Sequence, residues 1–207
     1  MTCRDIPQRG FTLVEMLVTL TVLAILGAAG LPTFRDLIRR NHVSSASIAL
    51  AADLAYARTE AITRGTFVSI CPSAAGGTSC MSPDLNSSYA SGWLVYTYTP
   101  GTAVPGTAFA RGAAGSILLR QNAGSQGVSI QAADGKAIRF DQQGQFNSSG
   151  TGTTVRNPPS FLICSTGGVA DGSVGTSTVR APGTFLALDA SGNVSHTSIA
   201  SGESCGA

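Results

Sequence analysis

The chain has 207 residues, a formal net charge of +2 and only 12% charged residues. This length allows one membrane segment and one domain large enough to bury a core. The weak charge gives no electrostatic case for a polyanion as the main partner. Of the residues, 43% are hydrophobic, and the N-terminal segment supplies much of that share.

The first predicted element is an apolar run over 11–34, which carries a single charge, Glu15. At about 1.5 Å per residue, a helix of this length crosses a hydrocarbon layer of about 30 Å. A carboxylate inside such a segment is costly, so it indicates a function. A secretory signal does not suit Glu15, and a plain anchor leaves both Glu15 and the Gly10-Phe11 junction without an explanation.

The hexapeptide Gly10-Phe11-Thr12-Leu13-Val14-Glu15 resembles the processing site of type IV prepilins and of type II secretion pseudopilins. The resemblance implies that a prepilin peptidase cleaves after Gly10 and that Phe11 is N-methylated. The new amino group of Phe11 is then a cation that can pair with a carboxylate in an apolar bundle. Because Phe11 cannot easily fold back onto its own fifth residue, we expect Glu15 of a neighbouring subunit to be the partner and to set register during assembly.

The second half of the helix is predicted from an apolar stripe with spacings of three and four, beyond the membrane run. Gly65 is a stop signal, so one helix is expected from Phe11 to about Arg64. The charged residues, including Asp53 and Arg58, lie mostly off the stripe. The stripe itself is best interpreted as core packing; it consists of Val43, Ala46, Leu50, Leu54, Ala57 and Ala61.

Short strands are predicted beyond Gly65, where Gly, Ser and Thr are frequent. Asp134-Gly135 is typical of a hairpin turn. The expected fold is α+β, with a long N-terminal helix against an antiparallel β domain of two small sheets. The predicted strands cover 67–71, 93–99, 117–120, 128–131, 138–140, 161–164 and 184–188.

Four cysteines follow the leader, which itself contains Cys3, and they allow three pairings. Pairing Cys71 with Cys80 and Cys164 with Cys205 is preferred, because it closes a short loop and fastens the C-terminus to a strand. A four-cysteine zinc site is the alternative, but no Cys-x-x-Cys pair occurs. Disulfides indicate an oxidising space such as a periplasm, so the domain is expected to face outward.

Three further segments strengthen the resemblance: 57–64, 91–95 and 138–144. In order and spacing they are similar to recurring features of the GspH/FimT family, which comprises FimU/FimT-like minor pilins and H-type pseudopilins. The resemblance implies a type IV pilin-like fold. The expected division is a leader at 1–10, a transmembrane half-helix at 11–34, an amphipathic half-helix at 35–65 and a periplasmic β domain at 66–207.

Catalytic function is not indicated. The two histidines, His42 and His196, have no metal-spaced companions, and neither a Gly-x-Ser-x-Gly nor a P-loop motif occurs. No catalytic residue, metal or cofactor is therefore expected.

DNA reception is a second alternative, since some FimT-like relatives bind DNA through a Gly-Arg-x-Arg element near the C-terminus. The comparable stretch here, Leu188 to His196, has no arginine. Phosphate binding depends on clustered cations, and the basic residues of the domain are scattered in sequence. Nucleic acid is therefore a disfavoured partner.

The expected function is that of a minor pilin that helps initiate or cap a type IV pilus in a Gram-negative envelope. An H-type pseudopilin of type II secretion is the alternative. The implied partners are other minor pilins, the major pilin, an inner-membrane assembly platform and the prepilin peptidase. The expected location is the inner membrane, in a single pass with a periplasmic C-terminal domain, and then the filament.

Overall fold

The computed structural model describes residues 10–81, 88–99, 108–133, 137–148, 159–167, 173–189 and 191–206. It divides into two compact units, Met1–Leu37 and Ile38–Ala207. The first unit contains the start of α1 (Leu13–Arg64), whose side chains are largely exposed and apolar, and the second contains the rest of α1 and every strand. The predicted long helix is confirmed.

The end of α1 is defined by a glycine. Gly65 has φ +60°, a conformation that costs glycine little. The N–H of Thr66 donates to the carbonyl of Ala61, and that of Gly65 donates to Ile62. This pair of bonds is a Schellman motif, so the stop predicted from the sequence has its expected geometry.

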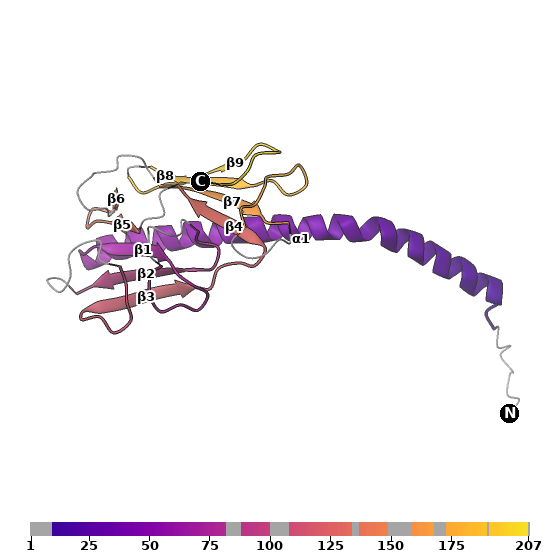
Figure 1. The fold of residues 1–207 in the computed structure, drawn as a ribbon, viewed down its shortest axis with the longest axis horizontal. Coiled ribbons are helices and arrows are strands. Elements are labelled where there is room, and N and C mark those ends of the chain that lie inside the picture. The colour runs from indigo at the N-terminus through magenta and orange to yellow at the C-terminus, as the bar shows by residue number, and fades with distance from the viewer. Residues whose placement is uncertain are drawn as a thin grey trace, which may run out of the picture. The chain divides into compact units, whose positions relative to one another are not determined.

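In the described part of the chain, nine strands follow in two antiparallel sheets (Figure 1). The first sheet has the order β3-β2-β1-β5-β6 and the second β4-β7-β8-β9. The strands are β1 (Val68–Pro72), β2 (Trp93–Tyr98), β3 (Ser116–Asn122), β4 (Val128–Ala132), β5 (Ile138–Phe140), β6 (Phe146–Ser148), β7 (Ser160–Ser165), β8 (Thr184–Leu188) and β9 (Val194–Ser198). The α+β architecture and its two sheets agree with the sequence-based expectation.

One core joins the helix to both sheets. The predicted stripe of α1 is buried, with Leu50, Leu54, Ala57 and Ala61 completely inaccessible to solvent. These side chains share a hydrophobic cluster with residues of β1, β2 and β5 on one side and β4, β7 and β8 on the other. The stripe is therefore core packing, as interpreted from the sequence.

The predicted hairpin at Asp134-Gly135 is wrong. These two residues lie outside the described part of the chain, but the strands that flank them belong to different sheets. β4 pairs with β7, whereas β5 pairs with β1 and β6. A turn signal reports a local reversal, and here the segment after it crosses to the other sheet instead of returning along the same one.

Two strands were not predicted. β6 is only three residues long, and β9 has the polar sequence Val-Ser-His-Thr-Ser, without an alternating apolar pattern. Both are second strands of hairpins, which pair with β5 and β8 respectively. Their partners, and not their own hydrophobicity, make them strands.

Candidate functional site

The N-terminal site consists of Gly10, Phe11, Thr12 and Glu15. Phe11 is 77% exposed and precedes the helix. The backbone N–H of Glu15 donates to Thr12 Oγ1 at 3.3 Å, and the N–H of Met16 donates to the Thr12 carbonyl at 3.2 Å. Thr12 is therefore the N-cap, and Thr12-x-x-Glu15 has the spacing of a capping box.

Glu15 lies where its negative charge is favourable for the helix and where a partner can reach its carboxylate. In the first turn its negative charge lies near the positive end of the helix dipole. Within the described residues, no cation lies within ion-pairing distance of its carboxylate. The side chain is exposed, so a cation from another chain can reach it.

The helix from Leu13 onward is apolar and long enough to cross a membrane by length and composition. Its exposed large side chains include Leu17, Leu20, Leu23 and Leu26. In water this surface would be costly, because apolar area gains about 25 cal/mol per Å² when it is removed from solvent. A lipid bilayer or a bundle of similar helices is the environment that this surface fits.

A polar network fastens α1 to the first sheet. The side chain of Asp53 is only 5% exposed. Its carboxylate accepts a hydrogen bond from Trp93 Nε1 at 2.8 Å and forms an ion pair with Arg120 Nη1 at 2.6 Å. The Arg120 guanidinium also lies 4.2 Å from the centre of the Tyr56 ring. In the sequence, Asp53 is one of the charged residues that lie mostly off the apolar stripe. Its side chain is nevertheless buried, because both carboxylate oxygens have hydrogen-bond partners in the interior.

A β-bulge brings Arg120 to the helix. Between β2 and β3 the register shifts at Val95/Tyr96, so Val95 is opposite Arg120 while Tyr96 is opposite Leu118. Val95 faces the core beside α1. The extra residue thus turns Arg120 toward the same side, which no periodicity in the sequence would indicate. The carboxylate of Asp53 raises the pKa of Arg120 through their hydrogen bond.

A second network holds two turns of similar sequence together. Asp141-Gln-Gln-Gly144 connects β5 to β6, and Asp189-x-Ser-Gly192 connects β8 to β9. In each turn the aspartate Oδ1 accepts backbone N–H groups, and the glycine has positive φ, +74° and +81°. Hydrogen bonds from Ser191 and Asn193 lower the pKa of Asp189 to about 2.

Arg58 of α1 joins these two turns. Its Nε donates to the Gly144 carbonyl at 3.2 Å, and its Nη1 donates to Asn193 Oδ1 at 2.9 Å. A Cβ on Gly192 would lie 2.7 Å from the Gly144 carbonyl oxygen, so the turns are in close contact. The repeated Asp-x-x-Gly pattern, followed by an apolar residue two positions on, is the signal that could have identified this pair.

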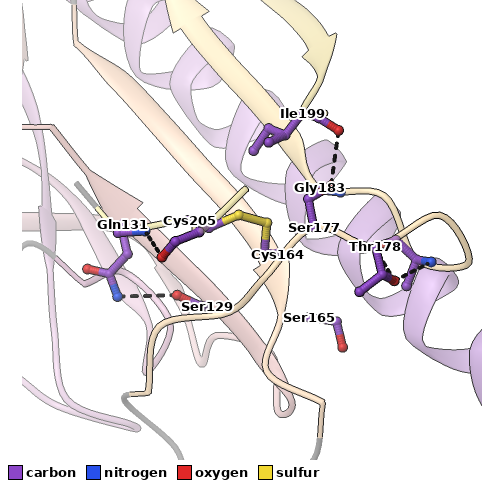
Figure 2. Close-up of a disulfide and its surroundings, with 12 residues drawn as sticks. Ser129, Gln131, Cys164, Ser165, Ser177, Thr178, Gly183, Ile199 and Cys205 are labelled. Atoms are coloured by element: carbon purple, nitrogen blue, oxygen red, sulfur yellow. Dashed lines mark hydrogen bonds between the residues drawn. A yellow bond between two sulfur atoms is a disulfide. The ribbon is translucent and has the colours of Figure 1, made fainter. Parts of the chain in front are cut away.

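The four cysteines that follow the leader are joined in two disulfides, the pairing that the sequence favoured: Cys71 with Cys80 and Cys164 with Cys205. The first holds the loop after β1, whose Cys80 N–H donates to the Phe109 carbonyl. The second holds a C-terminal strap, which we define as residues 173–183 and 199–206, against β7. Figure 2 shows this disulfide with Ser177 and Gly183 beside it.

Ser177 holds the strap together. It is fully buried, accepts the Gly183 N–H at 3.0 Å and donates to the Ile199 carbonyl at 3.0 Å (Figure 2). A Cβ on Gly183 would collide with Cys164 Sγ, so only glycine fits beside the disulfide. Within the described residues, no group of three or more His, Cys, Asp or Glu could hold a metal ion.

These features define a class: a type IV pilin-like fold, with one long, apolar and capped N-terminal helix whose second half packs on antiparallel sheets. A family model described as type II transport protein GspH matches residues 46–173, and the prokaryotic N-terminal methylation motif matches residues 7–31. The chain belongs to the GspH family. It is thus a subunit of the minor pilin and pseudopilin kind, a family of structural proteins that assemble with other pilins.

Solved structures of low sequence identity were also found. FimU, a type IV minor pilin of Pseudomonas aeruginosa PAO1, is 18% identical in one crystal form, with a TM-score of 0.44 over 76% of this chain and 98% of that one. The minor pseudopilin EpsH from the type 2 secretion system of Vibrio cholerae is 10% identical, with a TM-score of 0.45 over 76% and 97%. None of the curated protein sequences matches the chain significantly.

Proposed function

We propose that this chain is a minor pilin that helps initiate or cap a type IV pilus. It would be cleaved after Gly10, methylated at Phe11 and anchored in the inner membrane with residues 66–207 in the periplasm. The capped and exposed Glu15, at the start of an apolar helix, carries the proposal. In a bundle of such helices, the new amino group of Phe11 on a neighbouring subunit would neutralise the carboxylate.

A second feature supports assembly. In α1 between Ser44 and Thr63, the exposed positions carry no charged side chain, and the charged Arg58 and Glu60 are only half-exposed. The exposed positions are Ser44, Ser45, Ile48, Ala52, Ala55, Thr59, Ile62 and Thr63. The solvent face of a surface helix normally carries charged residues. A neutral face with small side chains fits close packing against neighbouring subunits, as a filament requires.

The choice of a pilus over type II secretion depends on the domain. The long loops after β1 and β2 are fastened to each other by hydrogen bonds between Cys80 and Phe109 and between Arg111 and Thr78. Elaborate loops fixed by a disulfide suit a subunit exposed at a pilus tip. Deleting the gene is expected to abolish twitching motility while leaving type II secretion intact, and complementation with the wild-type gene should restore twitching. Lost secretion with normal twitching would instead identify a pseudopilin.

Neither catalysis nor DNA binding is the function that we propose. In the stretch comparable to the DNA-binding element of FimT-like relatives, Asp189 is an acid that repels phosphate, and the side-chain amide of Asn193 is engaged with Asp189 and Arg58. Arg120 is paired with Asp53, and Arg139 lies over the Phe67 ring. A salt-sensitive gel shift at micromolar protein would overturn this view, since clustered free cations are what phosphate binding requires.

A further inference from the structure

The two sheets have four edges, and three of them are protected. β3 is distorted by the bulge and carries Arg120, and β6 is only three residues long. The outer edge of β4 is covered, because the N–H of Tyr89 donates to the Ile130 carbonyl and Ser88 bridges to Gln131. Bulges, short strands and covering segments are the usual means of preventing edge-to-edge pairing.

β9 has none of these protections. It is five residues long and has no proline, lysine or formal charge, and four of its five residues are exposed. Within the described residues, β8 is its one strand partner. The polar edge is therefore open to a further strand.

The unpaired backbone groups of β9 can be identified. The Ile199 N–H donates to the Gly183 carbonyl, and the Asp189 N–H donates to the Asn193 carbonyl, both at 2.9 Å. Hydrogen-bonded pairs recur at every second residue of an antiparallel ladder, so Ser195 and Thr197 face β8. The N–H and C=O groups of Val194, His196 and Ser198 then point outward.

Both ends of this strand are fixed. At its start, Arg58 and Asp189 hold the turn through Asn193. At its end, the carbonyl of Ile199 accepts a hydrogen bond from Ser177 in the strap, which the Cys164–Cys205 disulfide fastens. A strand held in its extended form binds a partner with little further loss of entropy.

We propose that β9 is a docking edge for an extended segment of a different subunit, which adds as a fifth strand to the second sheet. This inference rests on the proposed function, because it requires an assembled complex. The exposed hydroxyl and imidazole side chains favour an uncharged partner strand with Ser, Thr or β-branched residues, which form cross-strand pairs.

A second copy of this chain fits less well. The start of β9 lies near Arg58, late in α1. Its end lies at the end of the sheet where the Gly167 carbonyl accepts a hydrogen bond from Arg39, which is earlier in α1. β9 therefore runs in the direction opposite to α1. Two copies paired antiparallel about a two-fold axis would have α1 helices that point in opposite directions. Subunits anchored in one membrane point the same way.

The test compares backbone hydrogen exchange in the full-length chain purified in detergent with exchange in native envelopes that contain the assembled filament. We expect the exposed amides of Val194, His196 and Ser198 to exchange at least about tenfold more slowly in the assembly, as amides do when they gain a partner. Residues 116–122 of β3 serve as the control edge and should not change. Equal exchange at β9 in both samples would overturn the inference.

A matched pair of variants gives a second readout. His196→Pro removes an outward N–H without removing a bond to β8, whereas His196→Ala keeps it. His196→Pro is expected to lower incorporation into filaments at least about fivefold, and His196→Ala to leave it near wild type. Formation of both disulfides checks folding; if the proline variant fails that check, the exchange comparison on the wild-type chain decides.

The outcomes also separate this inference from the proposed function. Wild-type chain that enters pili with an unprotected β9 edge would refute the docking edge alone. Wild-type chain that is absent from pili would refute the pilus role, and the exchange comparison in envelopes would still decide the fate of the edge. A His196→Cys variant that forms a disulfide-linked dimer with itself in detergent would show a second copy as the occupant, against the proposal.

Discussion

Glu15 combines two roles that a pair of substitutions can separate. It stands at the glutamate position of the Thr12-x-x-Glu15 capping-box pattern, and its exposed carboxylate is the group that we propose to pair with a neighbouring subunit. Glutamine also serves at the third position of a capping box. Glu15→Gln therefore keeps a side chain suited to the capping box and removes the charge, whereas Glu15→Ala removes both the polar side chain and the charge. The bond from the backbone N–H of residue 15 to Thr12 Oγ1 remains possible in both variants.

We predict that both Glu15 variants reduce filament incorporation more than about tenfold, because removing one member of a buried ion pair costs about 3 to 5 kcal/mol. Quantitative blotting of sheared filaments against whole cells measures this. Cleavage after Gly10 should continue in both variants, as shown by the mass of the mature chain. Normal incorporation of Glu15→Gln with loss for Glu15→Ala would mean that the polar side chain matters and its charge does not.

Substitutions of Asp53 give a second prediction at the scale of single residues. Asp53→Ala leaves the buried indole N–H of Trp93 without its acceptor, so we expect a loss of about 1 to 3 kcal/mol in the free energy of unfolding. Asp53→Asn retains an acceptor and should cost less. Thermal unfolding of the two variants in the same detergent, followed by Trp93 fluorescence, makes the comparison. Equal losses would show that the charge of Arg120 dominates.

At the scale of elements, the paired turns should respond to acid. The pKa of Asp189 is about 2 in the folded chain, below its ordinary value of 3.8, so folding favours the carboxylate. Its contribution to stability is present above about pH 4 and is lost as the pH falls toward 2. The protection of the Asn193 amide against hydrogen exchange, relative to its intrinsic rate at each pH, should fall over that range in the wild type. Asp189→Asn should remove most of that pH dependence.

Substitutions of Arg58 test the contact between the two turns. Arg58→Ala removes its hydrogen bonds to both turns. We expect faster amide hydrogen exchange in 141–145 and 191–193. Little change is expected in β1 or β2, because the hydrogen bonds to the aspartate within each turn remain. Arg58→Lys can retain one of the two contacts and should be intermediate. Unchanged exchange in both turns would show that direct packing at Gly192 is sufficient.

At the scale of the whole molecule, the second disulfide fastens the C-terminal strap over the outer side of β7. Replacing Cys164 and Cys205 together by serine opens a loop of 41 residues, for which the chain-entropy estimate is about 4 kcal/mol. We expect a large fall in unfolding temperature and protease cleavage within 173–183 and 199–206. Replacing Cys71 and Cys80 instead opens a loop of 9 residues and should cost less.

Local sequence patterns determined much of the structure of this protein. The apolar run, the Gly10-to-Glu15 motif, the helical stripe and Gly65 predicted α1, because each depends on spacing along one helix. The short runs of strand-forming residues predicted most strands, and the stripe identified the core face. Even the favoured cysteine pairing followed from loop length and a nearby strand.

Tertiary structure decided what depends on contacts between distant segments. Pairing of β4 with β7 instead of β5 separates the sheets, and the bulge turns Arg120 toward Asp53. β9 is a strand because β8 pairs with it, and its edge is open because no described segment covers it. Hydrogen bonds and burial between segments far apart in sequence have no period, so the sequence alone could not show them.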